Sequence, residues 1–278
     1  MNQVPATVIT NTEIMPGYHL LCVETPDIAA IAKPGQFVMV RCGQELTLRR
    51  PLSVYKIAKP SQVYFLFAVL DKLKRLPTVP PLREVEAIVG KGQGTLWLSQ
   101  RHKGDSLDLL GPLGNGFSIE PASKKLLLVA GGIGIAPLAF LAEQALSQGK
   151  SVTLLLGARS KTGLYPQKHL PSGIESIIAT EDGTAGRKGL ITDILPDFIN
   201  GADQIYACGP LAMYEAIAAQ RQQGHLRKPV QVSLEVRMGC GLGGCYGCSI
   251  RTRHGMKQVC LDGPVFNLDE ILWQEVKL

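Results

Sequence analysis

The sequence LLLVAGGIGIAP spans Leu126 to Pro137 and indicates how the second half of the chain folds. Its first part is an apolar run typical of a strand buried on both faces, and a glycine turn follows directly. Apolar residues then continue at helical spacing to about Gln148. In a strand-turn-helix context such as this, backbone amides of the turn bind the pyrophosphate of a dinucleotide. We therefore expect Gly132, Gly134 and Pro137 to contact a nicotinamide nucleotide, because proline suits the first helical turn, where it leaves no NH unpaired.

The chain after Lys124 alternates apolar runs with amphipathic segments, which is typical of βαβ units on a mostly parallel sheet. The expected elements are 126–130, 137–148, 152–156, 174–180, 204–207, 211–223 and 230–234. Cys208, Gly209 and Pro210 follow one of these strands at the carboxyl edge, where nucleotides bind. We expect them at the nucleotide site, the alternative for Cys208 being a buried inert thiol. Arg159, at the end of another strand, is a weak indication of a ribose 2′-phosphate.

The residues before Ser118 predict a small antiparallel barrel, because short β-rich stretches alternate with Gly and Pro signals and no helix is convincing. The expected strands are 18–25, 37–42, 63–69 and 84–89, with an exposed insertion at 71–83. Two motifs in this region are candidates for flavin binding, the segment Arg50, Pro51, Leu52 and Ser53 and the pair Gly94 and Thr95.

Arginine offers a fork that matches phosphate oxygens, and the Ser53 hydroxyl is placed to reach a flavin ring. The glycine-rich stretch 90–95 is suited to cradle a pyrophosphate, with a helix expected to start near Thr95. Alternatively, Arg50 is a basic residue at a strand end. Both stretch 90–95 and a second glycine-rich stretch, 111–116, are equally compatible with plain turns.

Four of the seven cysteines crowd into one glycine-rich segment: Cys240, Cys245, Cys248 and Cys260. The first three have the C-x4-C-x2-C spacing of plant-type [2Fe-2S] ferredoxins. The glycines among them allow positive φ and let backbone NH groups point at sulfur. The alternative is a zinc site with four cysteine ligands, which usually draws them from two C-x2-C pairs, whereas one is present here. Of the other cysteines, Cys22 and Cys42 are expected to be small core residues.

Composition excludes several classes of protein. The net charge of +6 over 278 residues is not gathered into a basic run, so nucleic acid is not an expected partner. The start of the chain lacks the pattern of a secretion signal, so we expect a cytoplasmic location. The uncharged stretch 126–142 is interrupted by glycines and Pro137, so no membrane span is expected.

Three domains are predicted, a β-barrel at 1–120, an α/β domain at 121–234 and an iron-sulfur domain at 235–278, too short for a core of its own.

Taken in order, these motifs resemble the ferredoxin-reductase superfamily over nearly the whole chain. The segments 238–248 and 259–266 are similar to the family of electron-transfer subunits of dihydroorotate dehydrogenase B. The resemblance implies that Arg50, Pro51, Leu52, Ser53, Gly94 and Thr95 bind FAD and that the four clustered cysteines bind [2Fe-2S]. The stretch between Ser53 and Thr95 is longer than in that family, so its middle flavin contact has no assigned residue.

The resemblance also implies a function in pyrimidine (UMP) biosynthesis. Dihydroorotate is oxidised at FMN in a separate catalytic subunit, and electrons cross through [2Fe-2S] to FAD and reduce NAD+. No catalytic residue is expected, because the cofactors carry the chemistry, and Ser53 and Cys208 are expected near the flavin and the nicotinamide. A heterotetramer with two of each subunit is implied, and this chain alone is not expected to oxidise dihydroorotate.

Two other functions stay open from the residues alone. One is an electron-transfer subunit of another NAD(P)H-linked complex, of the sulfhydrogenase or ferredoxin-NADP reductase type. The other is a non-catalytic, zinc-stabilised docking module.

Overall fold

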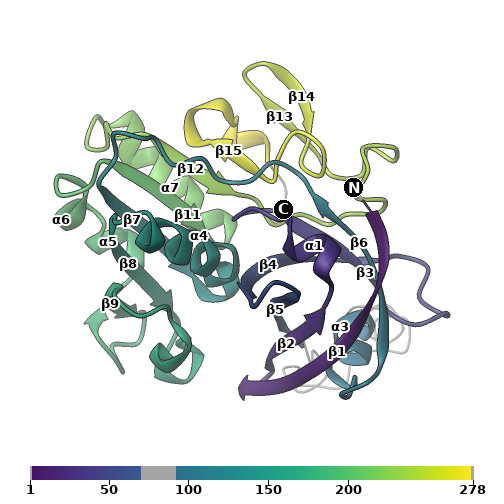
Figure 1. The fold of residues 1–278 in the computed structure, drawn as a ribbon. Coiled ribbons are helices and arrows are strands. Elements are labelled where there is room, and N and C mark those ends of the chain that lie inside the picture. The colour runs from purple at the N-terminus through teal and green to yellow at the C-terminus, as the bar shows by residue number, and fades with distance from the viewer. Residues whose placement is uncertain (1, 70–91, 277–278) are drawn as a thin grey trace, which may run out of the picture.

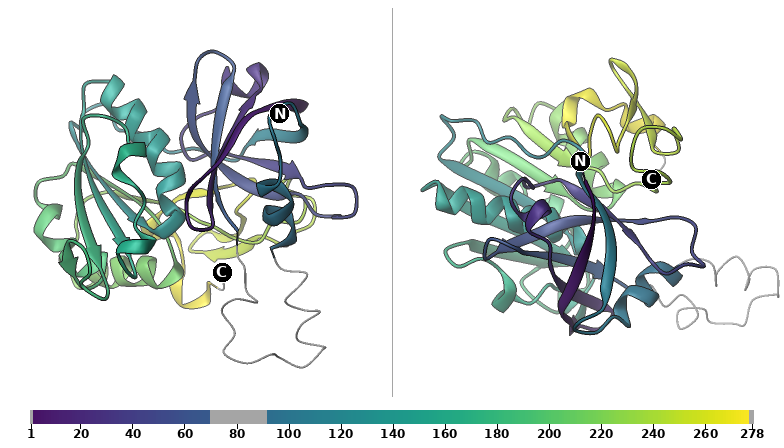
Figure 2. Two further views of the ribbon diagram at one scale, coloured as in Figure 1. Left: turned by 90° about the horizontal axis from the view of Figure 1, so that it is seen from below. Right: turned by 45° about the vertical axis from the view of Figure 1, so that its right-hand side comes forward.

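The protein consists of an antiparallel β-barrel and a parallel α/β sheet that lie beside each other, with the cysteine-rich segment at one side of their junction (Figure 1). The computed structural model describes residues 2–69 and 92–276. Figure 2 shows the same arrangement from two further directions, with the C-terminal segment in yellow against both bodies. The predicted architecture, an antiparallel barrel followed by a mostly parallel α/β sheet and a small C-terminal segment, is confirmed.

The barrel closes in the strand order β1-β2-β5-β4-β3-β6. Its strands are β1 (Asn2–Met15), β2 (Tyr18–Glu24), β3 (Phe37–Arg41), β4 (Arg50–Ala58), β5 (Gln62–Ala68) and β6 (Ser106–Leu113). Alternate residues face inward, so that Val8, Val23, Phe65 and Leu109 are fully buried in one core. Two short helices accompany the strands, α1 (Pro26–Ala29) and α3 (Gln93–Ser99).

Three details of the barrel differ from the sequence prediction. The expectation of short strands was wrong for β1, which is 14 residues long and pairs with both β2 and β6. Residues 111–113, considered as part of a turn, are the end of β6. Helix α3 begins at Gln93, before the expected start at Thr95. The expected strand 84–89 and insertion 71–83 lie outside the described residues.

The second body is a seven-stranded sheet in the order β10-β9-β8-β7-β11-β12-β15. Its strands are β7 (Lys125–Gly131), β8 (Ser151–Ala158), β9 (Glu175–Thr180), β10 (Arg187–Lys188), β11 (Gln204–Cys208), β12 (Val230–Ser233) and β15 (Val265–Asn267). Every neighbouring pair is parallel except β12 and β15, which are antiparallel. The chain order reverses between β7 and β11, and parallel sheets of this kind bind nucleotides at such a switch point.

Helices cover both faces of this sheet, which explains the uninterrupted apolar run in β7. The helices are α4 (Ile135–Ser147), α5 (Ile191–Ile194), α6 (Pro196–Ile199) and α7 (Leu211–Gln222), and 3-10 turns occupy Gly132–Gly134, Lys161–Gly163, Gln167–His169, Leu268–Glu270 and Trp273–Glu275. Leu126 and Leu128 share a core cluster with α4, whereas Leu127 and Val129 share one with α5, α6 and α7. Within residues 2–69 and 92–276, no helix has the length and apolar character needed to cross a membrane.

The cysteine-rich segment follows β12 and includes a small hairpin of β13 (Ser249–Thr252) and β14 (Gly255–Gln258). Its buried residues, among them Cys248, Cys260 and Trp273, belong to the same apolar cluster as the α7 side of the sheet. The chain then returns to the sheet as β15. The segment is thus held by cores that other parts of the chain provide. The predicted domain boundaries stay predictions.

The barrel and the sheet are joined by polar contacts from β4. The Tyr165 hydroxyl donates to the Tyr55 hydroxyl, which in turn donates to the carbonyl of His169. Lys56 forms an ion pair of 2.8 Å with Glu143 of α4. The strand that carries the Arg50–Ser53 motif is therefore attached directly to the second body.

Candidate functional site

The two candidate flavin motifs, which are distant in the sequence, are in contact. A Cβ atom added to Gly94 would lie 2.5 Å from Nε of Arg50 and 3.1 Å from its Cζ, so the guanidinium rests on the glycine main chain. Gly92, the residue before α3, has φ of +98°, which glycine adopts without strain. The Thr95 hydroxyl donates to the Gly92 carbonyl. Arg50 and the start of α3 thus form one surface with a cation and free glycine backbone, and this fits the phosphates of FAD.

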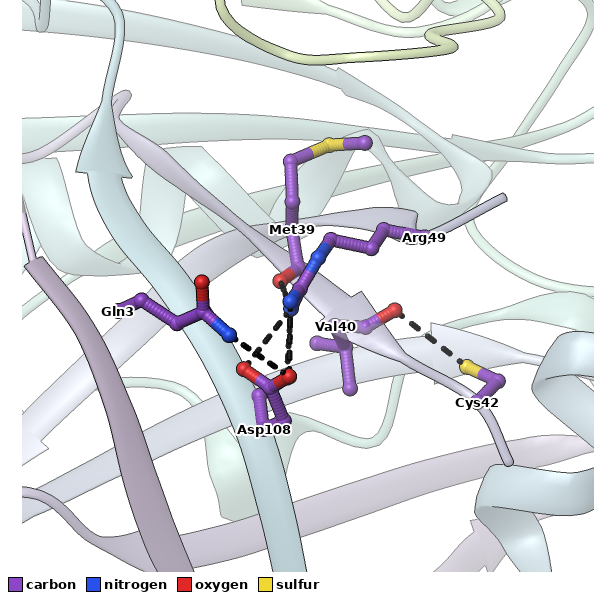
Figure 3. Close-up of polar contacts among 6 residues, drawn as sticks. All are labelled: Gln3, Met39, Val40, Cys42, Arg49 and Asp108. Atoms are coloured by element: carbon purple, nitrogen blue, oxygen red, sulfur yellow. Dashed lines mark hydrogen bonds and ion pairs between the residues drawn. The ribbon is translucent and has the colours of Figure 1, made fainter. Parts of the chain in front are cut away.

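The neighbouring Arg49 binds other parts of the protein and not the glycine stretch, although the sequence does not distinguish the two arginines. Figure 3 shows its guanidinium turned toward Asp108 of β6. Both Nη atoms of Arg49 donate to the Asp108 carboxylate, at 3.1 and 2.8 Å, and Nη1 also donates to the carbonyls of Asp108 and Met39. Gln3 of β1 donates to the same carboxylate. Arg49 therefore ties β3, β6 and the start of β4 together and is not available for a ligand.

Single substitutions at Gly94 and at Arg49 are expected to have different effects, the first on FAD binding and the second on the stability of the fold. We expect Gly94→Ala to push Arg50 aside and to weaken FAD binding about tenfold, the worth of one lost charge-assisted hydrogen bond. Arg49→Lys, which cannot keep the two-pronged contact with Asp108, is expected to lower the free energy of unfolding by about 1 kcal/mol and to leave FAD affinity unchanged. Flavin titration and urea unfolding of both variants check this. Loss of FAD from Arg49→Lys alone would contradict it.

The two nucleotide motifs also meet, at the switch point of the sheet. A Cβ on Gly134 would lie 2.0 Å from the carbonyl oxygen of Cys208, and one on Gly131 would lie 2.7 Å from Cδ of Pro210. Only glycine permits this approach of the turn after β7 to the segment after β11. By contrast, a Cβ on Gly132 would meet nothing within 4 Å, so this residue faces open space in front of α4. The site thus offers the room and the helix start that a pyrophosphate needs.

Cys208 lies in a buried polar group that the sequence did not reveal. Its Sγ is 3.8 Å from Oε1 of Glu235, to which it donates. In the same group, the Tyr214 hydroxyl accepts a hydrogen bond from the NH of Gly209 and donates one to the carbonyl of Ser233. Burial raises the pKa of the Cys208 thiol well above its usual range, so it is a thiol at neutral pH.

Glu235 is the functional candidate that sequence reasoning missed. The residue as a whole is exposed, but the protein around its carboxyl removes water, and this burial raises its pKa above the ordinary 4.5. It directly follows the apolar run 230–234, so an acidic residue at a strand end was the available signal. Its carboxyl is an acceptor beside Cys208 at the carboxyl edge of the sheet.

Replacing this carboxyl predicts a pH-dependent difference in stability. A raised pKa in the folded state means that ionisation disfavours folding, and the cost grows as pH rises from 4.5 through the folded pKa. Glu235→Gln carries no such charge. We therefore expect the variant to gain stability relative to the native chain as pH rises through this window, and to lose that gain as pH falls below it. Urea unfolding at a series of pH values measures the difference, and a pH-independent difference would refute it.

The four clustered cysteines form two neighbouring pairs, Cys240 with Cys245 and Cys248 with Cys260. Cys245 helps to lower the pKa of Cys240, and Cys248 and Cys240 both help to raise the pKa of Cys260. Across residues 2–69 and 92–276, no group of three His, Cys, Asp or Glu side chains is arranged to hold one metal ion. Four cysteines that influence one another's ionisation fit a [2Fe-2S] cluster, in which four cysteines serve two irons.

Backbone NH groups point at these sulfur atoms, as predicted from the glycines. Leu242 donates to Sγ of Cys240 at 3.3 Å, Gly243 to that of Cys260 at 3.2 Å, and Cys260 to that of Cys248 at 3.5 Å. The bond from Leu242 lowers the pKa of Cys240 to about 7, whereas burial raises that of Cys260 to about 12. A thiolate at the buried Cys260 position would need a cation beside it, and the iron of a bound cluster would supply that charge. Cys22 and Cys42 are fully buried in the barrel, as expected of core residues.

The structure thus brings the predicted residues together in three groups: Arg50 with Gly94, Gly134 with Cys208, and the cysteine pairs. Among the described residues, no hydrogen bond joins the Arg50–Ser53 motif to Cys208–Pro210. Arg159 is exposed at the rim of the sheet, where its carbonyl accepts from Asp182. The residue roles at all these positions stay predictions.

Comparison with known proteins agrees with this arrangement. A family model described as the iron-sulfur cluster binding domain of dihydroorotate dehydrogenase B matches residues 235–272, and an oxidoreductase NAD-binding domain matches residues 128–219. The structure of an NADH-dependent reduced ferredoxin-NADP oxidoreductase superposes with a TM-score of 0.78 at 27% identity, covering 99% of this chain and 92% of that one.

Two curated relatives match at higher identity. The dihydroorotate dehydrogenase B (NAD(+)) electron transfer subunit of Desulforamulus reducens is 35% identical, over 97% of this chain and 98% of that relative. The subunit of the same name from Geobacillus sp. (strain WCH70) is 36% identical, over 98% and 99%. The chain therefore belongs to the family of dihydroorotate dehydrogenase B electron transfer subunits.

Proposed function

We propose that this chain takes electrons from an FMN-containing catalytic subunit that oxidises dihydroorotate and delivers them to NAD+. The cysteine pairs would hold [2Fe-2S], Arg50 to Ser53 with Gly94 and Thr95 would hold FAD, and the turn 131–137 with Cys208 to Pro210 would hold the nucleotide. Hydride chemistry at the nicotinamide and one-electron chemistry at the cluster require a flavin between them, because FAD exchanges electrons in both ways.

One observation carries this proposal: the two neighbouring strands β3 and β4, which include the candidate flavin motif, contact both the cysteine loop and the body that holds the parallel sheet. Met39 of β3 contacts the cysteine loop, and Tyr55 of β4 contacts the sheet through Tyr165. The flavin motif at the start of β4 is therefore central. The chain's own residues bind and orient the cofactors, and no acid-base pair is assigned.

The exposed apolar surface beside the cysteine loop is the place where we propose that a catalytic partner docks. Cys245 is exposed, and near it in sequence Tyr246 is 71% and Leu242 45% exposed. Leu261, which lies against Gly243 of the same loop, is 58% exposed. Exposed apolar side chains gathered next to a functional group are typical of a protein interface. We propose that the catalytic subunit docks here, in a complex with two copies of each chain located in the cytoplasm.

The test begins with the chain purified anaerobically. We expect about two irons, about two sulfides and one FAD per chain, without zinc. NADH should reduce the bound flavin, while dihydroorotate should have no effect until the catalytic subunit is added, when NADH forms from NAD+. Zinc without flavin would overturn the proposal. Reduction of the chain by dihydroorotate in the absence of a partner would overturn the assigned division of labour.

The second candidate function is that of a subunit of a ferredoxin-NADP oxidoreductase, and the 27% identity to such a structure supports it. The higher identity to dihydroorotate dehydrogenase subunits, 35% and 36% over nearly the whole chain, favours the first. Copurification distinguishes them, because an FMN-containing partner active on dihydroorotate is expected only in the first case.

A further inference from the structure

The main chain immediately after Cys240 rests on the barrel. Gly241 has φ of +74°, and a Cβ added to it would lie 2.5 Å from Cγ of Met39, 3.1 Å from its Sδ and 3.4 Å from Cδ1 of Leu113. No larger residue fits at this point. One limb of the cysteine loop is therefore in direct contact with a single side chain of β3.

Met39 belongs at the same time to the strand pair that carries the flavin motif. Strands β3 and β4 are antiparallel, and their register places Met39 opposite Pro51 and Val40 opposite Arg50. The Met39 side chain is fully buried in the cluster that contains Cys248 and Cys260, whereas Val40, on the opposite face of β3, is buried inside the barrel. Met39 thus contacts the cysteine loop with its side chain and pairs with the candidate flavin strand through its backbone.

The backbone at Met39 is held in place. Its carbonyl accepts from Nη1 of Arg49 at 3.3 Å, and Arg49 is itself fixed by Asp108 (Figure 3). The contact under the cysteine loop therefore belongs to a braced strand, which is what a defined distance between two cofactors requires.

The other limb of the loop is fastened to the end of β6. The NH of Asn115 donates to the carbonyl of Gly263, and its side chain donates to the carbonyls of Leu261 and Asp262, just after Cys260. With Asn115 as a hydrogen-bonded clamp on the other limb, Met39 makes the closest apolar contact beneath the loop at Gly241, and Leu113 lies farther away.

We propose that Met39 is a positioning residue for electron transfer between the cluster and the flavin, an inference that rests on the proposed function. Met39 forms no bond and takes no electron in this step. One electron leaves the reduced cofactor and enters the oxidised one, and Met39 sets the separation that the electron crosses. Because the rate of electron transfer falls steeply with separation, a loop that settles differently slows the step without changing what either cofactor binds.

The test uses the full chain with both cofactors bound and follows, after mixing with NADH, the reduction of the flavin and then of the cluster. Met39→Ala is expected to slow cluster reduction about tenfold, as small misplacements of reacting groups do. Flavin reduction, iron content and both midpoint potentials should stay unchanged. Met39→Leu, a change that conserves volume, should retain the native rate. The matched control is Val40→Ala, on the same strand but facing into the barrel.

Other results of these measurements would contradict either the positioning role of Met39 or the proposed function. Equal rates of cluster reduction in Met39→Ala and Val40→Ala would overturn the proposal, and so would a slowed rate explained by a shifted midpoint potential. If Met39→Ala loses iron, Met39→Val replaces it, and iron loss there as well would make Met39 a structural residue and overturn the positioning role. Absence of flavin or iron from the native chain would instead overturn the proposed function, before any variant is made.

Discussion

Cys260→Ser is expected to abolish iron binding and to loosen the C-terminal segment, while the barrel and the nucleotide-binding sheet stay folded. Cys260 is 3% exposed, and its sulfur accepts an NH from Gly243. The segment around it has no core of its own and shares one with the sheet. Loss of the cluster therefore removes its main cross-link, because metal binding and folding are coupled in so small a unit.

Iron and sulfide assays, together with limited proteolysis, measure both effects. We expect full loss of iron and new cleavage between residues 239 and 264, with FAD retained. Cys22→Ser is the matched control, because Cys22 is equally buried but lies in the barrel. It should keep all its iron and lose stability only through packing, by about 1 kcal/mol. A Cys260→Ser protein with native iron content would remove Cys260 from the ligand set.

Gly134→Ala is expected to be the most damaging single exchange in the nucleotide-binding body. The added Cβ would lie 2.0 Å from the carbonyl oxygen and 2.4 Å from the carbonyl carbon of Cys208. Backbone atoms cannot turn aside as a side chain does, so β7 and β11 must separate at the switch point. We expect a loss of about 3 kcal/mol in the free energy of unfolding and weakened NADH binding.

Gly132→Ala provides the comparison. It has φ of +55° with nothing within 4 Å, so its exchange adds backbone strain without a steric clash. That strain costs about 1 kcal/mol. Urea unfolding should therefore rank Gly134→Ala clearly below Gly132→Ala. The reverse order would show that the close approach of the turn to Cys208 is not the property that requires glycine.

The sequence predicts the elements of this protein best where one local requirement dominates. The apolar run 126–130 became β7 because both its faces are covered, and Leu211 begins α7 as expected. Prediction failed where local signals were ambiguous. Gly111 to Leu113 has turn residues but completes β6, because its neighbours β1 and β3 supply strand pairing that the local sequence cannot disclose.

By itself the sequence determined the chemistry available to this protein, because cysteine spacing and a glycine turn between strand and helix are local patterns. The family-level conclusion follows from the same residues. Only the tertiary structure decided which of these residues contact one another. It assigned Arg49 to Asp108 and Arg50 to Gly94, brought Glu235 to Cys208, and seated the cysteine loop on Met39. These pairings join residues that are separated in the chain. The arginine contacts exist only once the barrel has closed, the Glu235 contact only once β11 and β12 lie side by side, and the Met39 contact only once the cysteine-rich segment packs on the barrel.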